Sequence, residues 1–342
     1  MVKEAVVLIN VGTPDNYKVK AVQRYLSQFL NDPRVMDLPW LLRKVLVNAI
    51  IVPFRAPISA RLYQKLWTSQ GSPLLTNLLE VQKKLQALLP PHIDVFAAMR
   101  YQNPSIPNTL EQIKKEGYDK VTLFPLFPQY ASSTTGTAIE AALKIIGKWN
   151  VIPEIRTIEQ FYLHPAFIDA FAQKIESHHP RQFDYIVFSY HGLPNRQLNT
   201  IHPEIKASEC SCKEEMPAHG RYCYKAACYE TTRLLVKKLQ LDEGTYSTAF
   251  QSRLSKNWMS PFTDSTLNEL ALMGKKRILV TAPSFVADCL ETSIEIADEY
   301  RKMFENAGGE KLTLVESLNA DEQWIEALHQ IINDKKNRLM AF

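Results

Sequence analysis

The stretch Tyr185-Ile-Val-Phe-Ser-Tyr-His-Gly-Leu-Pro194 decides how the rest of the chain is interpreted. Its first five residues, Tyr185–Ser189, are apolar or small and rich in β-formers, which predicts a buried parallel strand. The strand ends at His191, because Gly192 and Pro194 break it. An ionisable side chain at such a strand end lies at the carboxyl edge of a sheet, where open α/β folds bind ligands. His191 is therefore a candidate functional residue, with a hydrogen-bonded turn histidine as the alternative.

Strand-like and helix-like segments alternate along the whole chain around this stretch. Repeated βα units of this size predict parallel sheets covered by helices. The expected strands are 5–10, 92–99, 120–127, a short strand within 150–163, 185–190, 246–251, 277–282 and 311–315.

The two halves of the chain resemble each other. Val7-Leu-Ile-Asn-Val-Gly-Thr-Pro14 is similar to Val187-Phe-Ser-Tyr-His-Gly-Leu-Pro194, with Val11 at the place that His191 takes in the second copy. We therefore expect two similar α/β domains, residues 1–150 and 151–342, that meet at a cleft. Since only the second copy has the histidine, the chemistry is expected in the second domain.

Composition sets bounds on partners and compartment. The chain has 342 residues, 46% of them hydrophobic, and a net charge of +4 from 40 basic and 36 acidic residues. This charge is too mild to indicate a nucleic-acid partner. The N-terminus enters a strand directly and no signal peptide is visible, so a cytoplasmic, reducing setting is expected.

The segment 31–60 is unusually apolar for a surface and unusually basic for a core. Its apolar residues are interleaved with Arg34, Arg43, Lys44 and Arg55. A bilayer span takes ~20 apolar residues, and the Arg43-Lys44 pair in the middle argues against one. Two interpretations remain. One is an amphipathic core helix; the other is an apolar lip with a basic rim, suited to a flat, apolar, anionic ligand or a membrane surface.

An acidic column follows the 277–282 strand. Glu291, Glu295 and Glu299 are spaced i, i+4 and i+8 in a predicted helix over 288–306, which places them on one face. Like charges at this spacing destabilise a helix by ~0.2–0.5 kcal/mol per pair, and the helix dipole compensates only in the first turn. The column is either a solvated acidic face or a ladder that handles cations or protons. His191 and Glu291 could face each other as a sparse, open metal site.

Four of the five cysteines lie close together, as Cys210-x-Cys212-x10-Cys223-x4-Cys228. In a reducing compartment such a group indicates a metal more than disulfides. Structural zinc and a [2Fe–2S] cluster both fit four thiolates, and free thiols are the alternative. His202 and His219 are near enough in sequence for a mixed ligand set.

Taken together, the motifs resemble the ferrochelatase family. They occur in the family's order over nearly the whole chain: Leu8-Ile-Asn-Val-Gly-Thr-Pro14, Phe29-Leu-Asn-Asp-Pro-Arg-Val35, Gly71-Ser-Pro-Leu74, Arg100-Tyr101, Pro128-Gln-Tyr-Ala-Ser-Ser-Thr-Thr-Gly136, Ser189-Tyr-His-Gly-Leu-Pro194, Phe250-Gln-Ser-Arg253, Trp258, Pro261, Thr263-Asp264 and Phe285-Val-Ala-Asp-Cys-Leu-Glu-Thr292.

The resemblance implies a fold and a reaction. The fold is the chelatase fold, two similar Rossmann-like domains with parallel four-stranded sheets flanked by helices. The reaction is that of a lyase, which inserts Fe²⁺ into protoporphyrin IX to give protohaem, the last step of haem biosynthesis, with release of two protons. Alternatives are a chelatase for coproporphyrin or for another divalent metal, and a non-catalytic haem- or metal-binding protein.

The resemblance also implies site residues. His191 is the metal ligand and acceptor of pyrrole protons, Glu291 the carboxylate that faces it, and Glu295 and Glu299 an acidic relay. Cys289 takes a position where some members have histidine. The porphyrin pocket is implied to include Arg100, Tyr101, Ser132, Ser133 and Trp258.

Further implications concern partners. Some bacterial members carry a [2Fe–2S] cluster on an internal cysteine group, which favours iron–sulfur over zinc on Cys210, Cys212, Cys223 and Cys228. Segment 31–60 matches the apolar lip at the mouth of the pocket, where peripheral membrane contact would occur. The expected partners are porphyrin and ferrous iron, and no oligomeric state is predicted.

Overall fold

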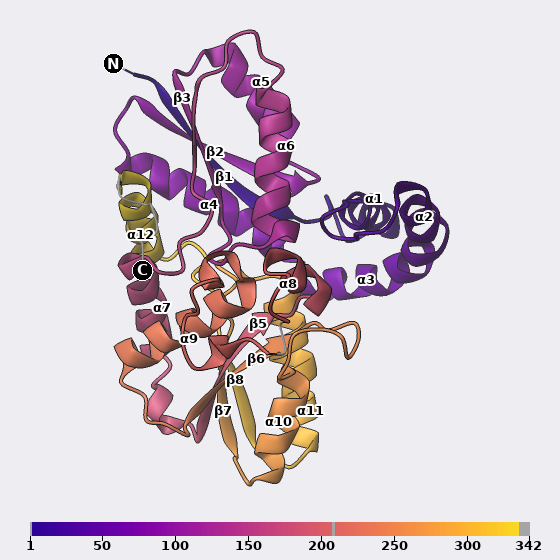
Figure 1. The fold of residues 1–342 in the computed structure, drawn as a ribbon, viewed down its shortest axis with the longest axis vertical. Helices are drawn as coiled ribbons and strands as arrows, with labels where there is room; N and C mark the ends of the chain where they lie inside the picture. Colours follow the sequence, from indigo (N-terminus) through magenta and orange to yellow (C-terminus); the bar gives the residue numbers. More distant parts are fainter. Residues whose placement is uncertain (1, 207–208, 335–342) are drawn as a thin grey trace. The chain divides into compact units, whose positions relative to one another are not determined.

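The computed structural model describes residues 2–206 and 209–334 and divides the chain into two compact units (Figure 1). The first unit is the chain up to Phe127 together with Ala131–Gln160; the second is Pro128–Tyr130 and the chain from Phe161. The expected domain boundary at residue 150 lies too early. The short strand β4 (Glu154–Thr157) pairs in parallel with β3 (Lys120–Pro125) and therefore belongs to the first sheet.

The first unit is built on a four-stranded parallel sheet with the order β2-β1-β3-β4. Its central strand β1 (Glu4–Gly12) pairs with β2 (Ile93–Tyr101) and with β3. Residues 5–9 are fully buried, as expected of a strand that is covered on both faces. The covering helices include α1 (Val19–Leu30), α4 (Pro73–Leu88), α5 (Ile106–Glu116) and α6 (Thr137–Ile146).

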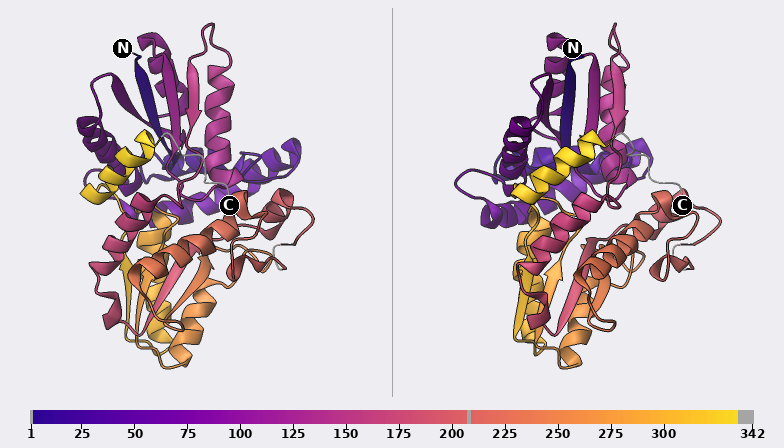
Figure 2. Two further views of the ribbon diagram at one scale, coloured as in Figure 1. Left: turned by 60° about the vertical axis from the view of Figure 1, so that its left-hand side comes forward. Right: turned by 90° about the vertical axis from the view of Figure 1, so that its left-hand side faces the viewer.

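The second unit repeats this topology. Its parallel sheet has the order β6-β5-β7-β8, the same arrangement of first, second, third and fourth strands. Helices lie on both sides of each sheet (Figure 2). The strands are β5 (Tyr185–His191), β6 (Tyr246–Gln251), β7 (Arg277–Thr281) and β8 (Lys311–Val315), and the helices include α7 (Pro165–Glu176), α8 (Asn195–Ile201), α9 (Tyr224–Leu239), α10 (Thr263–Leu272) and α12 (Glu322–Asn333).

This topology confirms the expected fold class and the internal repeat. Every expected strand is present within a few residues of its expected bounds. The reason is that both sheets are buried on both faces, so each strand is a short apolar run bounded by turn residues.

The helix after β7 differs from the expectation. An α-helix is predicted over 288–306, whereas the structure has a π-helix, Glu291–Tyr300, followed by α11 (Arg301–Asn306). π-Helices are rare and are frequently found at functional sites. Their i to i+5 hydrogen bonds make residues five apart neighbours, and this changes which side chains meet the acidic column.

Segment 40–66 is one long helix, formed by α2 (Trp40–Val45), a π-helical turn (Leu46–Ile51) and α3 (Val52–Leu66). It is not a core helix: only 22% of its most apolar window is buried. Trp40 and Phe54 are 65% and 75% exposed. By length and composition alone, among the described residues, this helix is apolar enough to cross a membrane. The core-helix interpretation is therefore wrong, and an apolar exposed face remains, which we call the lip helix.

Candidate active site

His191 ends β5 with a buried, unsatisfied ring nitrogen. Its Nδ1 has no hydrogen-bond partner within the part of the chain that the structure describes. Its backbone N–H donates to Ser284 Oγ at 3.2 Å, and its ring meets Phe285 edge-on at 6.2 Å. Burial lowers the pKa of His191 below its ordinary 6.5, and the nearby charge of Glu291 opposes this shift. The imidazole is therefore neutral near pH 7 and has a lone pair to offer a proton or a metal.

Glu291 is the first residue of the π-helix and lies close enough to His191 for its charge to act on the imidazole. Its backbone carbonyl accepts the Gln251 Nε2–H at 3.2 Å. The buried thiol of Cys289 is hydrogen-bonded to the Glu291 carboxyl, and burial raises the pKa of this thiol well above 9.0. Cys289 is thus a protonated donor beside Glu291. The structure brings together the imidazole and the carboxylate that the sequence analysis paired.

Glu295 follows four residues after Glu291 on the same helix. Its carboxylate accepts the Ser252 N–H at 2.9 Å, the Ser252 hydroxyl at 2.5 Å and the Tyr300 hydroxyl at 2.7 Å. Burial raises the pKa of Glu295 above 4.5, with a smaller contribution from the charge of Glu291. Tyr300 is five residues from Glu295, so the π-helical winding makes this contact. Glu299, by contrast, is exposed and lies outside the buried part of the column.

Trp258 lies beside the end of β5 because the residue after His191 is glycine. A Cβ on Gly192 would lie 2.9 Å from the Gln251 carbonyl oxygen and 3.6 Å from Trp258 Cε3. The chain that carries Trp258 is held there by a bridge to Pro194 and by the Met259 N–H, which donates to the Leu193 carbonyl at 2.9 Å. The strand-breaking glycine therefore serves close packing around the histidine.

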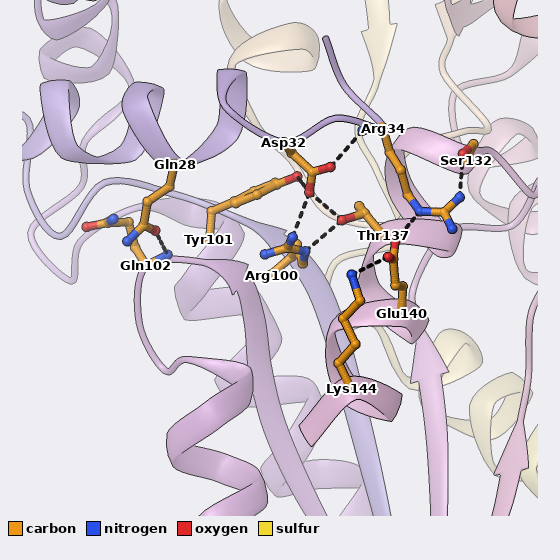
Figure 3. Close-up of polar contacts among 10 residues, drawn as sticks. All are labelled: Gln28, Asp32, Arg34, Arg100, Tyr101, Gln102, Ser132, Thr137, Glu140 and Lys144. Atoms are coloured by element: carbon orange, nitrogen blue, oxygen red, sulfur yellow. Dashed lines mark hydrogen bonds and ion pairs between the residues drawn. The ribbon is translucent and has the colours of Figure 1, made fainter. Parts of the chain in front are cut away.

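In the first unit, Arg100 and Tyr101 converge on a buried carboxylate that the sequence analysis left without a role (Figure 3). Asp32 Oδ2 accepts from Arg100 Nη2 at 2.6 Å and from the Tyr101 hydroxyl at 2.9 Å. Thr137 Oγ1 donates to the same oxygen at 2.5 Å. Asp32 fixes both residues, and its position in Asn-Asp-Pro-Arg, directly after a helix, was the signal available in the sequence.

Ser132 and Ser133 lie in a π-helical turn, Ser132–Gly136, that leads into α6. The Ser132 hydroxyl accepts from Arg34 Nη1 at 2.8 Å. Arg34 also pairs with Glu140, which holds the pKa of that carboxyl at about 2 (Figure 3). Both serines are only half-buried, so they are within reach of a ligand, whereas Tyr101 is 2% exposed.

The four clustered cysteines come together in the second unit. Three of them, Cys212, Cys223 and Cys228, are buried, and burial with neighbouring thiols raises the pKa of Cys212 to about 12. Two thiol–imidazole contacts are present: Cys223 Sγ to His202 Nε2 and Cys210 Sγ to His219 Nε2, both 3.2 Å. Among the described residues, no three histidine, cysteine or acidic side chains are arranged to hold a metal ion.

Comparisons with known proteins agree with this architecture. The family model "Ferrochelatase" matches residues 3–336. The chain is 41% identical over 337 residues to a ferrochelatase of Legionella pneumophila, covering 97% of this chain and 99% of that one. It is 40% identical to one of Pseudomonas fluorescens (96% and 97% covered) and 41% identical to one of Coxiella burnetii (95% and 92% covered).

Two solved structures of SirB show the same fold. SirB from Bacillus subtilis with Fe³⁺ superimposes with a TM-score of 0.52 at 12% identity, covering 97% of this chain and 94% of that one. The sirohydrochlorin chelatase SirB from Bacillus subtilis subspecies spizizenii, in complex with cobalt, superimposes with a TM-score of 0.53 at 11% identity, covering 98% of this chain and 97% of that one. At these identities the likeness shows the fold alone.

Proposed function

The chain belongs to the ferrochelatase family, lyases that insert ferrous iron into a porphyrin in haem biosynthesis, and we propose that His191 and Glu291 carry this reaction here. The observation that supports the assignment best is the neutral imidazole near Glu291, whose buried Nδ1 has no partner among residues 2–206 and 209–334. A resting histidine in a folded core normally has its ring nitrogens paired.

The mechanism follows from the balance of charge. Insertion removes two pyrrole protons and adds one dication, so the net charge of the macrocycle does not change. His191 accepts the two pyrrole protons one after the other, and the Glu291 carboxylate stabilises the imidazolium that forms each time. Glu295, whose pKa is raised, accepts each proton from His191, and the exposed Glu299 returns it to water before the next one is removed. His191 and Glu291 can bind the incoming Fe²⁺ substrate, for which oxygen and imidazole are suitable ligands.

The substrate proposed is protoporphyrin IX, with protohaem as product and coproporphyrin as the competing substrate. In the second unit, Trp258 supplies an aromatic face beside the end of the His191 strand. In the first unit, the half-buried Ser132 and Ser133 supply hydroxyls, and Asp32 holds Arg100 and Tyr101, so these two side chains act by keeping their own surface rigid rather than by moving onto a ligand. A rigid pocket can distort the macrocycle and turn a nitrogen lone pair towards the metal.

The decisive experiment is insertion of zinc into protoporphyrin, followed by porphyrin fluorescence, in wild type and His191→Ala. The variant is expected to bind porphyrin, keep its circular-dichroism spectrum and lose turnover. Normal turnover by this variant refutes the assignment. A wild type that binds porphyrin without turnover would instead be a carrier. Parallel assays with protoporphyrin and coproporphyrin decide between the two substrates.

For the cysteine group we propose a [2Fe–2S] cluster held by Cys210, Cys212, Cys223 and Cys228, with structural zinc as the alternative. The support is that the four thiols lie near enough for their charges to influence one another and that three of them are buried. A cluster there ties the segment before α9 to the second unit. Anaerobically purified protein is expected to absorb above 400 nm and to contain iron and acid-labile sulfide in equal amounts. A colourless protein with one zinc per chain would reverse the choice.

We also propose a cytoplasmic protein that touches the membrane surface through the lip helix. The support is its exposed apolar face and the basic residues that flank it, Lys44, Arg55 and Arg61. Apolar side chains with basic neighbours are typical of helices that lie in the interface of anionic bilayers.

A further inference from the structure

Gln251 connects the strand that carries His191 to the helix that begins at Glu291. In the parallel register of β5 and β6 it lies opposite His191, and its carbonyl accepts the Gly192 N–H at 2.9 Å. Its side chain is 1% exposed. Oε1 accepts the Ser189 hydroxyl at 2.6 Å, and Nε2 donates to the Glu291 carbonyl at 3.2 Å. One buried amide therefore fixes the spacing between the two proposed catalytic residues.

Ser252 does the same for the second carboxylate. Its backbone is left-handed, with φ of +63°, a conformation that is uncommon for any residue but glycine. In that conformation both its N–H and its hydroxyl donate to Glu295, one to each carboxylate oxygen, at 2.9 and 2.5 Å. Unfavourable backbone conformations persist where the surrounding structure imposes them, and they cluster at functional sites.

We propose that Gln251 and Ser252 are positioning residues of the chelatase reaction, which hold Glu291 and Glu295 in one row in front of His191. The inference rests on the proton path proposed above. Neither residue needs to touch the porphyrin or the iron, since each acts through a glutamate.

The hydrogen bonds from Ser252 also set how readily Glu295 gives up its proton. They favour the ionised carboxylate, whereas burial favours the protonated one. The titratable groups around it are Glu291 and Tyr300 on the same helix and Asp264 on α10, whose charge acts on the Tyr300 hydroxyl. Losing the serine hydroxyl therefore shifts the pKa of Glu295 upwards.

The test is the pH profile of zinc insertion into protoporphyrin by Ser252→Ala. The variant is expected to lose about tenfold in kcat, since a hydrogen bond to a charged group is removed, with an unchanged KM for porphyrin. The acid limb of its profile is expected to move to higher pH. The matched control is Ser247→Ala on β6, the strand that ends one residue before Ser252, because Ser247 Oγ is buried without a partner among the described residues. A profile that does not move contradicts the proposal.

A double-mutant cycle separates this inference from the proton path on which it rests. In a Glu295→Gln background, Ser252→Ala is expected to have no further effect, because the residue through which it acts is already neutral. Additive losses overturn the inference. If Glu295→Gln alone turns over like wild type, the proton path is wrong and the inference falls with it, while His191 and Glu291 are still tested by their own variants.

Gln251→Met removes the amide bridge and keeps the volume of the side chain. It is expected to lower kcat by about tenfold, with the KM for porphyrin unchanged. An unchanged kcat with a raised KM would place Gln251 in porphyrin binding and contradict a positioning role. Thermal unfolding of each variant, recorded in parallel, identifies any loss that comes from unfolding.

Discussion

At the scale of single residues, the site depends on two pKa shifts in opposite directions. Burial lowers the pKa of His191 and raises the pKa of Glu295. The charge of Glu291 acts on both groups. Two groups whose pKa values are shifted towards each other can exchange a proton with little change in free energy. Burial is the largest cause of both shifts, so they come from the fold.

This arrangement predicts a signed pH effect. Since His191 must be neutral to act, the acid limb of kcat/KM is expected below pH 6.5. The charge of Glu291 raises the pKa of His191, so Glu291→Gln should lower that pKa further. The acid limb of kcat/KM for this variant should therefore lie at still lower pH than that of the wild type. Turnover should fall by about 10²-fold or more, the range of general acid–base catalysis. Asp298→Asn on the same helix, whose carboxylate pairs with Lys302 at 2.7 Å, is the control and is expected to leave the profile unchanged.

A second residue-scale prediction concerns stability. Asp32→Ala leaves the Arg100 guanidinium, only 26% exposed, without its carboxylate partner. Breaking a buried pair in this way costs about 3–5 kcal/mol of unfolding free energy. Urea denaturation measures it. The exposed pair of Asp15 and Arg24 is the comparison, where Asp15→Ala is expected to cost about 0–1 kcal/mol. Equal costs at both positions would show that Asp32 does not hold the cluster together.

At the scale of elements, two helices explain most of what the structure adds. The π-helix, Glu291–Tyr300, places Tyr300 on Glu295, which α-helical spacing would not do. The lip helix, Trp40–Leu66, buries one face, which includes Val47 and Leu66, and leaves the apolar side chains of its other face exposed, among them Trp40 and Phe54. An exposed apolar patch of this kind marks an interaction surface.

The lip helix is expected to bind vesicles that contain anionic lipid. Trp40→Ser with Phe54→Ser should weaken binding in a flotation assay by tenfold or more, because burying one such side chain contributes about 1.5–3 kcal/mol. Stability should hardly change, since both side chains are more than half exposed. Leu272→Ser, at an apolar position 82% exposed on α10, is the control. Undiminished binding by the double variant would exclude the lip helix as the membrane contact.

At the scale of the whole molecule, buried titratable groups couple stability to pH. Burial lowers the pKa of His164, His191 and His219, so each binds protons more readily when unfolded. A lowered histidine pKa contributes stability above 6.5 that is lost as pH falls towards the folded pKa. Glu295, with a raised pKa, acts in the opposite direction, because its contribution is lost as pH rises through that pKa.

The unfolding temperature is therefore expected to fall between about pH 7.5 and about pH 5.5, since three histidines outweigh one glutamate. Scanning calorimetry at several pH values measures it. His191→Gln should flatten part of this dependence, because it removes one of the three groups. An unfolding temperature that rises towards acid would contradict the assignment of these directions.

The sequence by itself determined the fold class and all eight strands, and it predicted that His191 and Glu291 lie near each other. These depend on local patterns, because apolar runs bounded by glycine and proline define buried strands, and parallel strands bring their carboxyl ends to one edge. Only the tertiary structure decided the rest: the anchoring of Arg100 and Tyr101 on Asp32, the π-helical winding, and the contacts of Gln251 and Ser252 with the glutamates. The first and third are contacts between residues 40 or more apart in sequence, and the second is a one-residue change of helical register. No periodic pattern of residues in the sequence signals either kind of feature.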